Sequence, residues 1–142
     1  LISVIWDSPI FYSYPGAGSA LNYNFQEFNV GVSKDFEVAS ASATFNYSDD
    51  FFGGVGEAYY WDFGVEVPLP HKFTIAAHLG LQNFDDGAQD DYVDWSIGIA
   101  RPIKGIEVSL TYYDTDIDVG GFCGGSTDNC SERFVVAVSK AF

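Results

Sequence analysis

The stretch that decides the fold is Tyr59-Tyr-Trp-Asp-Phe-Gly-Val-Glu-Val67, in which two kinds of side chain take turns along the chain. Every odd position carries a large apolar or aromatic side chain, and the even positions between them carry Tyr60, Asp62, Gly64 and Glu66. A period of two places successive side chains on opposite faces of a β-strand. The stretch therefore predicts a strand with one apolar and one more polar face.

The same alternation recurs along the whole chain, and helical periodicity is almost absent. We expect eight strands, most of about ten residues. They cover approximately residues 3–14, 28–33, 39–47, 59–67, 73–82, 93–100, 106–113 and 134–142. In the first strand, Val4, Trp6, Ile10, Tyr12 and Tyr14 share one parity.

The connections between these strands alternate strictly between long and tight. The long ones are 15–24, 48–58, 83–91 and 114–131, and the tight ones are 34–37, 68–72 and 101–105. An antiparallel up-and-down meander of this kind carries all its long loops at one end of the sheet and all its tight turns at the other.

Length and composition exclude several classes of protein. A chain of 142 residues predicts a single domain, 1–142. Only six basic residues stand against twenty acidic ones, for a formal charge of −14, so there is no basic stripe to bind nucleic acid. The aromatic content of 18% argues against disorder. No apolar run approaches the length of about 20 residues that a membrane-spanning helix requires.

The second face of the strands distinguishes a soluble barrel from a membrane barrel. A face in contact with water is typically rich in charged residues, whereas this face is rich in Gly, Ser, Ala, Asn and Tyr. Small polar side chains suit an enclosed, hydrated interior, with the apolar face turned to lipid. We therefore expect an all-β, antiparallel, up-and-down transmembrane β-barrel with eight strands in this chain. A soluble ligand-binding barrel is the alternative class.

Aromatic residues on the apolar parity gather near the strand ends, as in the girdles of outer-membrane barrels. The expected girdle residues are Tyr47, Tyr59, Trp61, Trp95, Tyr112 and Phe134 near the long loops, and Phe36, Phe73 and Phe142 near the tight turns.

Charged and titratable side chains on the opposite parity are expected to face the lumen. They are Glu27, Asp62, Glu66, His78, Asp94, Glu107 and Arg133. One interpretation is an interior that favours cations, because carboxylates lower the cost of a passing positive ion. The other is an interior network in which Arg133 pairs with a carboxylate. The sequence does not place Asp62 and Asp94 next to each other.

The two cysteines, Cys123 and Cys130, enclose six residues, and in a secreted chain this spacing predicts a disulfide that closes a small loop. Catalytic motifs are missing: there is no Gly-x-Ser-x-Gly elbow and no His-Glu-x-x-His helix. We therefore expect a protein that is not an enzyme.

Acidic residues in the last long connection resemble the first half of a calcium loop. Asp114, Asp116 and Asp118 have the right spacing, but Val119 and Gly125 stand where an EF-hand needs Gly and Glu. An EF-hand is excluded. A weak calcium site and a solvated acidic loop remain as interpretations, and no other cofactor is expected.

Seven strings along the chain resemble the TorF-like porin family, in order and with similar spacing. The strings are Tyr14-Pro-Gly-Ala17, Tyr47-Ser-Asp-Asp-Phe-Phe-Gly53, Glu66-Val-Pro-Leu-Pro70, Ala77-His-Leu-Gly80, Asp94-Trp-Ser-Ile-Gly98, Tyr112-Tyr-Asp-Thr-Asp116 and Val138-Ser-Lys-Ala-Phe142. The resemblance implies a bacterial outer-membrane barrel whose last strand, ending on Phe142, is recognised by the barrel-assembly machinery. Family members are longer at the start, which leaves two alternatives: an eight-stranded barrel with an interior filled by side chains, or the C-terminal part of a barrel of about twelve strands, which is wide enough for an open channel.

These patterns lead to two hypotheses about function. The first is a porin in the bacterial outer membrane that passes small solutes with a preference for cations. The second is a structural or adhesive outer-membrane barrel that self-associates and whose acidic extracellular loops bind ions. Either protein would have outer-membrane lipid and lipopolysaccharide as partners, and the second would also form homo-oligomers.

Overall fold

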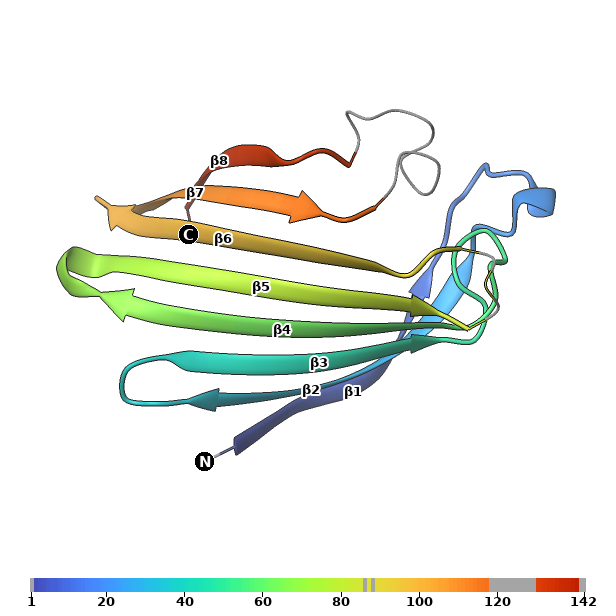
Figure 1. The fold of residues 1–142 in the computed structure, drawn as a ribbon, viewed down its shortest axis with the longest axis horizontal. Helices are drawn as coiled ribbons and strands as arrows, with labels where there is room; N and C mark the ends of the chain where they lie inside the picture. The colour runs from blue at the N-terminus through green and yellow to red at the C-terminus, as the bar shows by residue number, and fades with distance from the viewer. Residues whose placement is uncertain (1, 86, 88, 118–129, 141–142) are drawn as a thin grey trace.

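The chain forms a single antiparallel β-sheet in which every strand pairs with the next one along the sequence (Figure 1). The computed structural model describes residues 2–85, 87, 89–117 and 130–140. The strands are β1 (Ile2–Tyr12), β2 (Phe25–Asp35), β3 (Ser40–Ser48), β4 (Ala58–Leu69), β5 (Phe73–Phe84), β6 (Tyr92–Ile103), β7 (Ile106–Thr115) and β8 (Arg133–Ser139). Two short 3₁₀ turns, η1 (Ser19–Leu21) and η2 (Pro70–Lys72), lie in the connections. The prediction of eight up-and-down strands is confirmed. Within the described ranges, no helix has the length and apolar character needed to cross a membrane.

Two of the three tight turns, β4–β5 and β6–β7, are made by residues with left-handed backbone conformations. Lys104 and Gly105 connect β6 to β7 with φ angles of 52° and 81°, the two-residue geometry that suits the twist of a hairpin. His71 and Lys72, both at φ 64°, turn the chain between β4 and β5. Because these turns are so short, β4 and β6 extend further than the alternation predicted, to Leu69 and Ile103.

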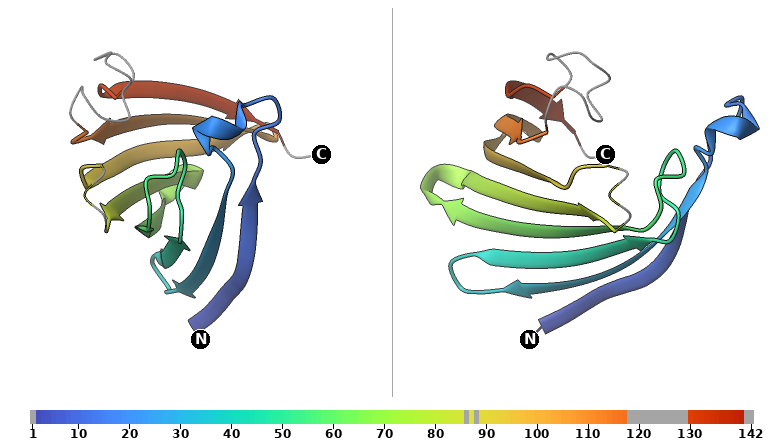
Figure 2. Two further views of the ribbon diagram at one scale, coloured as in Figure 1. Left: turned by 90° about the vertical axis from the view of Figure 1, so that its right-hand side faces the viewer. Right: turned by 45° about the vertical axis from the view of Figure 1, so that its right-hand side comes forward.

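The sheet curls into a trough whose two edges are β1 and β8 (Figure 2). No pairing joins these two strands in the described part of the chain. Pro9 lies on the edge strand β1, opposite Phe28 of β2. A proline lacks the N–H that an interior strand needs for a second neighbour, so it suits an edge strand.

Burial in this sheet is the reverse of that in a water-soluble domain. Large apolar side chains on one face are exposed, and among the described residues only Ala58 and Phe84 are both hydrophobic and buried. The buried polar side chains belong to the second face or to the strand ends. They are Asn29, Ser48, Gln82 and Ser96. We call the face with the exposed apolar side chains the convex face and the other the concave face.

A β-bulge near the start of β1 changes which residues share a face. The register with β2 shifts between Val4 and Trp6, so that Val4 pairs with Val32 but Trp6 pairs with Gly31. Ile10 and Tyr12 consequently lie on the concave face, beside Glu27. The expectation that Ile10 and Tyr12 lie on the apolar face is therefore wrong, because the bulge adds one residue to β1 and reverses its parity relative to β2.

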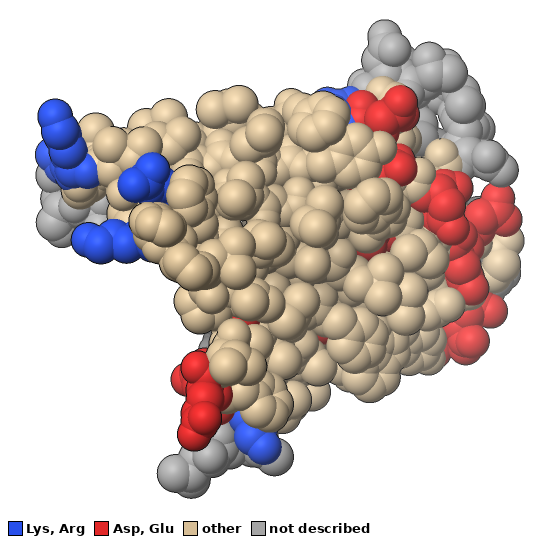
Figure 3. Space-filling model, turned by 60° about the vertical axis from the view of Figure 1, so that its left-hand side comes forward, with Lys and Arg blue, Asp and Glu red and all other residues tan. Residues whose placement is uncertain are grey.

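Charge is concentrated at the two ends of the sheet. Figure 3 shows a broad uncharged band, with the larger group of Asp and Glu at the long-loop end and most Lys and Arg, together with a smaller acidic group, at the other. Five of the six basic residues lie in or beside the tight turns or at the end of β8: Lys34, Lys72, Arg101, Lys104 and Lys140. An uncharged band between two charged rims has the layout expected of a barrel wall in a membrane.

Candidate functional site

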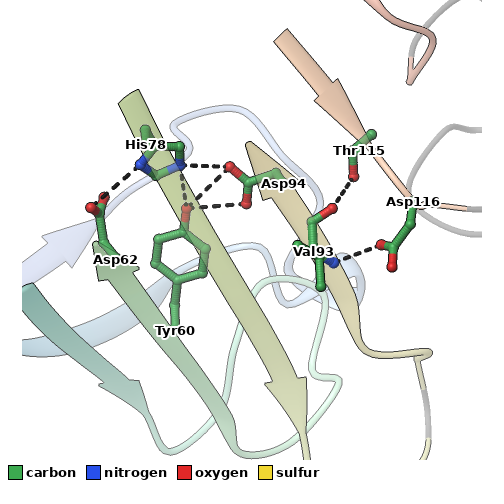
Figure 4. A network of polar contacts seen from close by, with 7 residues as sticks. All are labelled: Tyr60, Asp62, His78, Val93, Asp94, Thr115 and Asp116. Atoms are coloured by element: carbon green, nitrogen blue, oxygen red, sulfur yellow. Dashed lines mark hydrogen bonds and ion pairs between the residues drawn. The ribbon is translucent and has the colours of Figure 1, made fainter. Parts of the chain in front are cut away.

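The concave face carries a cluster of ionisable side chains that come from β4, β5 and β6 (Figure 4). His78 lies between two carboxylates: its Nδ1 is 3.4 Å from Asp62 Oδ1, and its Nε2 is 2.8 Å from Asp94 Oδ1. The Tyr60 hydroxyl donates to Asp94 Oδ2 at 3.1 Å and lies 3.3 Å from His78 Nε2. We call these four residues the Asp–His–Asp cluster.

Strand register and a glycine bring the cluster together. Gly80 of β5 pairs with Asp62 on one side and with Asp94 on the other. A Cβ atom at Gly80 would overlap the Tyr60 hydroxyl and Asp94 Oδ2. The missing side chain therefore lets residues from both neighbouring strands lean over β5 and meet His78. Other glycines of this face also lie opposite a polar neighbour, for example Gly98 beneath Thr111.

Gly80→Ala is expected to destabilise the folded protein by about 1 kcal/mol, because the new methyl group forces the outer ends of the Tyr60 and Asp94 side chains to shift. Denaturant unfolding measures the effect. Gly18→Ala is the control, since φ is −61° there and no atom lies within 4 Å of its Cβ position. Adding Tyr60→Phe to Gly80→Ala should recover part of the loss, because the hydroxyl oxygen is among the nearest obstacles. Equal costs at Gly80 and Gly18 would contradict the close packing.

The cluster is accessible from the trough and carries net negative charge. The side chains of Asp62, Asp94 and His78 are 38%, 31% and 27% exposed. An imidazolium at His78 can donate to both carboxylates, which leaves one net negative charge, and a neutral imidazole leaves two. A cation about 4 Å from one carboxylate gains about 1 kcal/mol even at the dielectric constant of water. The cluster can thus attract a cation in either state of His78.

The other residues expected to face the lumen lie apart from this cluster. Glu27 lines a hollow of about 300 Å³ with Tyr12 and Asn29. Glu66 lines another of about 280 Å³, nearer the tight turns, with Asp35. Both hollows are on the concave face.

Two more of the residues expected to face the lumen, Glu107 and Arg133, lie near opposite ends of the concave face. Glu107 pairs with Pro102 and Ser139 beside a tight turn. Arg133 starts β8, where its Nε donates to Ser131 O at 3.5 Å. Of the seven expected residues, the structure therefore brings together Asp62, His78 and Asp94.

The residues expected to form the aromatic girdle near the long loops lie on the convex face, where each contacts another aromatic ring. The hydroxyls of Tyr47 and Tyr59 both donate to Glu57, at 3.1 and 3.0 Å. Tyr112 lies between Trp95 and Phe134, with ring centroids 5.3 and 5.0 Å away. Trp61 packs against Phe45 at 4.6 Å.

At the tight-turn end, each of the two described girdle residues has a cation over its ring. Lys34 Nζ lies 4.8 Å from the centroid of Phe36, and the guanidinium carbon of Arg101 lies 4.8 Å from that of Phe73. Phe142 lies outside the described residues.

The carboxylates considered as a calcium site are engaged in holding strand ends. Asp116 Oδ1 accepts from Val93 N at 2.6 Å, and Asp114 Oδ1 accepts from Thr115 N at 2.9 Å (Figure 4 shows the first of these). Asp118 lies outside the described residues. Where the structure describes the chain, no group of three or more His, Cys, Asp or Glu residues is arranged to hold a metal.

The cysteine pair is only partly described. Cys130 is disulfide-bonded, and Cys123 lies outside the described residues. The pairing of Cys123 with Cys130 stays a prediction.

An aromatic cluster at the long-loop end was not expected from the sequence. Tyr12 stacks on Phe25 at 4.3 Å, and Tyr23 stacks on Phe52 at 4.4 Å. The β1–β2 and β3–β4 loops meet there, with Gly53 N donating to Asn22 O at 3.0 Å. The sequence feature that could have indicated this cluster is the presence of aromatic residues in the long connections. These connections have no strand periodicity, so the sequence does not show which aromatic side chains share a face.

A family model described as "Bacterial protein of unknown function (Gcw_chp)" matches residues 8–142. The chain belongs to this family. No curated protein and no solved structure matches the chain. The Gcw_chp model covers β2 to β8 completely and all three strands that carry the Asp–His–Asp cluster. The description of the Gcw_chp family assigns no activity, so the resemblance to TorF-like porins stays a sequence prediction.

Proposed function

We propose that this sheet forms all or part of the wall of an outer-membrane β-barrel. The barrel would pass small solutes with a preference for cations. The observation that carries the proposal is the exposure of the large apolar side chains on the convex face, with small and polar side chains buried on the other.

Two physical arguments favour lipid as the environment of the convex face. A soluble barrel gains its stability by burying large apolar side chains, and the described part of this sheet has almost none buried. Soluble monomers also rarely expose apolar patches larger than a few hundred Å². The side chains of Trp95, Ile97 and Ile99 are all exposed. Exposure of such apolar side chains carries no free-energy cost when lipid hydrocarbon surrounds them.

The distribution of charge on the concave face supports a preference for cations. The Asp–His–Asp cluster lies midway along the trough, and Asp35 and Glu66 lie in a hollow toward the tight turns. A solute moving along this face meets carboxylates in succession, and such groups stabilise cations and repel anions.

Planar-bilayer recording of the full chain tests the proposal. We expect steady conductance steps and, under a KCl gradient, a reversal potential of the sign that K⁺ selectivity produces. Folded protein that inserts into the bilayer but gives no steady current would overturn the transport function. A reversal potential of the opposite sign would overturn the cation preference alone.

A structural barrel that self-associates is the second candidate, and the free edges of the sheet favour it. β1 and β8 each have one side without a pairing strand in the described part of the chain. Exposed strand edges are templates for pairing with another chain. Cross-linking in membranes that yields stable oligomers, together with absence of current, would favour this second function.

A further inference from the structure

The convex face has an apolar groove at the tight-turn end that the transport proposal does not use. The groove has a volume of about 390 Å³ and lies across β5 to β8. Its apolar lining residues are Phe73, Ile99, Ile103, Val108, Leu110 and Val136, and Arg101 also lines it.

Arg101 places a positive charge in this groove. Its guanidinium carbon lies 4.8 Å from the centroid of Phe73, and the side chain is exposed. Stacking on an aromatic ring orients the guanidinium while leaving its N–H donors free for another partner.

Four of the cations at this end are not engaged in ion pairs with described residues, although acidic residues lie at the same end. Lys34, Lys72, Arg101 and Lys104 form no ion pair with the residues that the structure describes. This is unexpected in a chain with twenty acidic residues and a net charge of −14. These cations are therefore available to an anion outside the chain.

At this end of the sheet, basic and acidic residues of the strands lie on opposite faces. Lys34 and Arg101 are on the parity of the convex face. Asp35, Glu66 and Glu107 are on the parity of the concave face. The positive residues thus border the uncharged band, and the acidic ones border the trough.

We propose that the groove binds an anionic phospholipid, with an acyl chain along the apolar lining and a phosphate oxygen pair on the Arg101 guanidinium. This inference rests on the proposed membrane location. A guanidinium binds phosphate through two parallel hydrogen bonds, and the apolar lining gives an acyl chain a surface for van der Waals packing. Outer-membrane barrels carry their short turns on the periplasmic side, so this end lies in the phospholipid leaflet and not among lipopolysaccharide.

Native mass spectrometry of the full chain, released from mixed micelles of phosphatidylglycerol and phosphatidylcholine, tests the site. We expect selective retention of phosphatidylglycerol and a loss of about tenfold in that retention for Arg101→Gln, since hydrogen bonds to charged groups are among the strongest. Val108→Trp, which fills the groove and keeps the charge, should reduce retention as well. Lys34→Gln is the matched control, because Lys34 lies over Phe36 at the same 4.8 Å distance but does not line the groove.

The outcomes separate this inference from the membrane proposal. Equal retention of the two phospholipids, or equal losses for Arg101→Gln and Lys34→Gln, would overturn the phospholipid site in a chain that still folds into bilayers. In a second set of micelles that also contains lipid A, preferential retention of lipid A would overturn it in favour of lipopolysaccharide. Failure of the wild-type chain to fold into any bilayer would instead overturn the proposed function. Each variant is first checked for a wild-type strand content by circular dichroism, so that unfolding is not mistaken for lost binding.

Discussion

Ile97→Arg is expected to destabilise the folded protein in a phospholipid bilayer by about 2–4 kcal/mol. Ile97 lies midway along β6 on the convex face and is 50% exposed. If that face meets lipid, the arginine must enter the hydrocarbon near its midplane, where the cost for a barrel is greatest. If the face meets water, the same substitution at an exposed site changes stability by no more than about 0.5 kcal/mol.

The matched control is Ile103→Arg, on the same strand and the same face. Ile103 is 49% exposed, so the two sites differ in their distance from the strand end and hardly in exposure. At the membrane boundary an arginine costs about 1 kcal/mol or less. Urea unfolding from lipid vesicles, followed by tryptophan fluorescence, measures both variants. Equal and small costs at the two sites would contradict the proposal that lipid covers the convex face.

The strands and their faces could be predicted because a period of two is a local property of the sequence. The stretch 59–67 shows its two faces without reference to any other strand. The prediction was wrong where the backbone departs from that period. A single extra residue between Val4 and Trp6 reverses the parity of the rest of β1, and nothing in the composition of that strand marks the bulge.

The Asp–His–Asp cluster could be predicted in part. The alternation of the sequence predicted that Asp62, His78 and Asp94 lie on one face. Their contact, however, depends on the register of each strand relative to its neighbour. That register is set by turn geometry, here by the two left-handed residues of η2 and by the β5–β6 connection. Gly80 was visible in the sequence, but its role depends on Asp62 and Asp94 being paired with it. The aromatic contacts between the long loops depend on side chains without any periodicity, so the sequence held no comparable signal for them.

Replacing both carboxylates of the cluster, as Asp62→Asn with Asp94→Asn, is expected to lower the cation-over-anion permeability ratio by about fivefold or more. The estimate follows from about 1 kcal/mol of attraction per carboxylate for a cation at about 4 Å in water. Asparagine keeps the shape of aspartate and a hydrogen-bonding oxygen, so it removes the charge with little change in packing. Reversal potentials in planar bilayers, measured under a KCl gradient, give the ratio.

Two further variants test whether the permeability ratio depends on the position of the charges or only on the net charge of the protein. Asp49→Asn with Asp50→Asn changes the net charge equally, but these exposed residues lie in the β3–β4 loop, so the ratio should stay close to the wild-type value. His78→Gln removes the group of the cluster that can carry positive charge and leaves both carboxylates, so the ratio should not fall. A loop variant that lowers the ratio as much as the cluster variant would show that net charge sets the selectivity. In that case the contact of His78 with Asp62 and Asp94 would stabilise the sheet without selecting the solute.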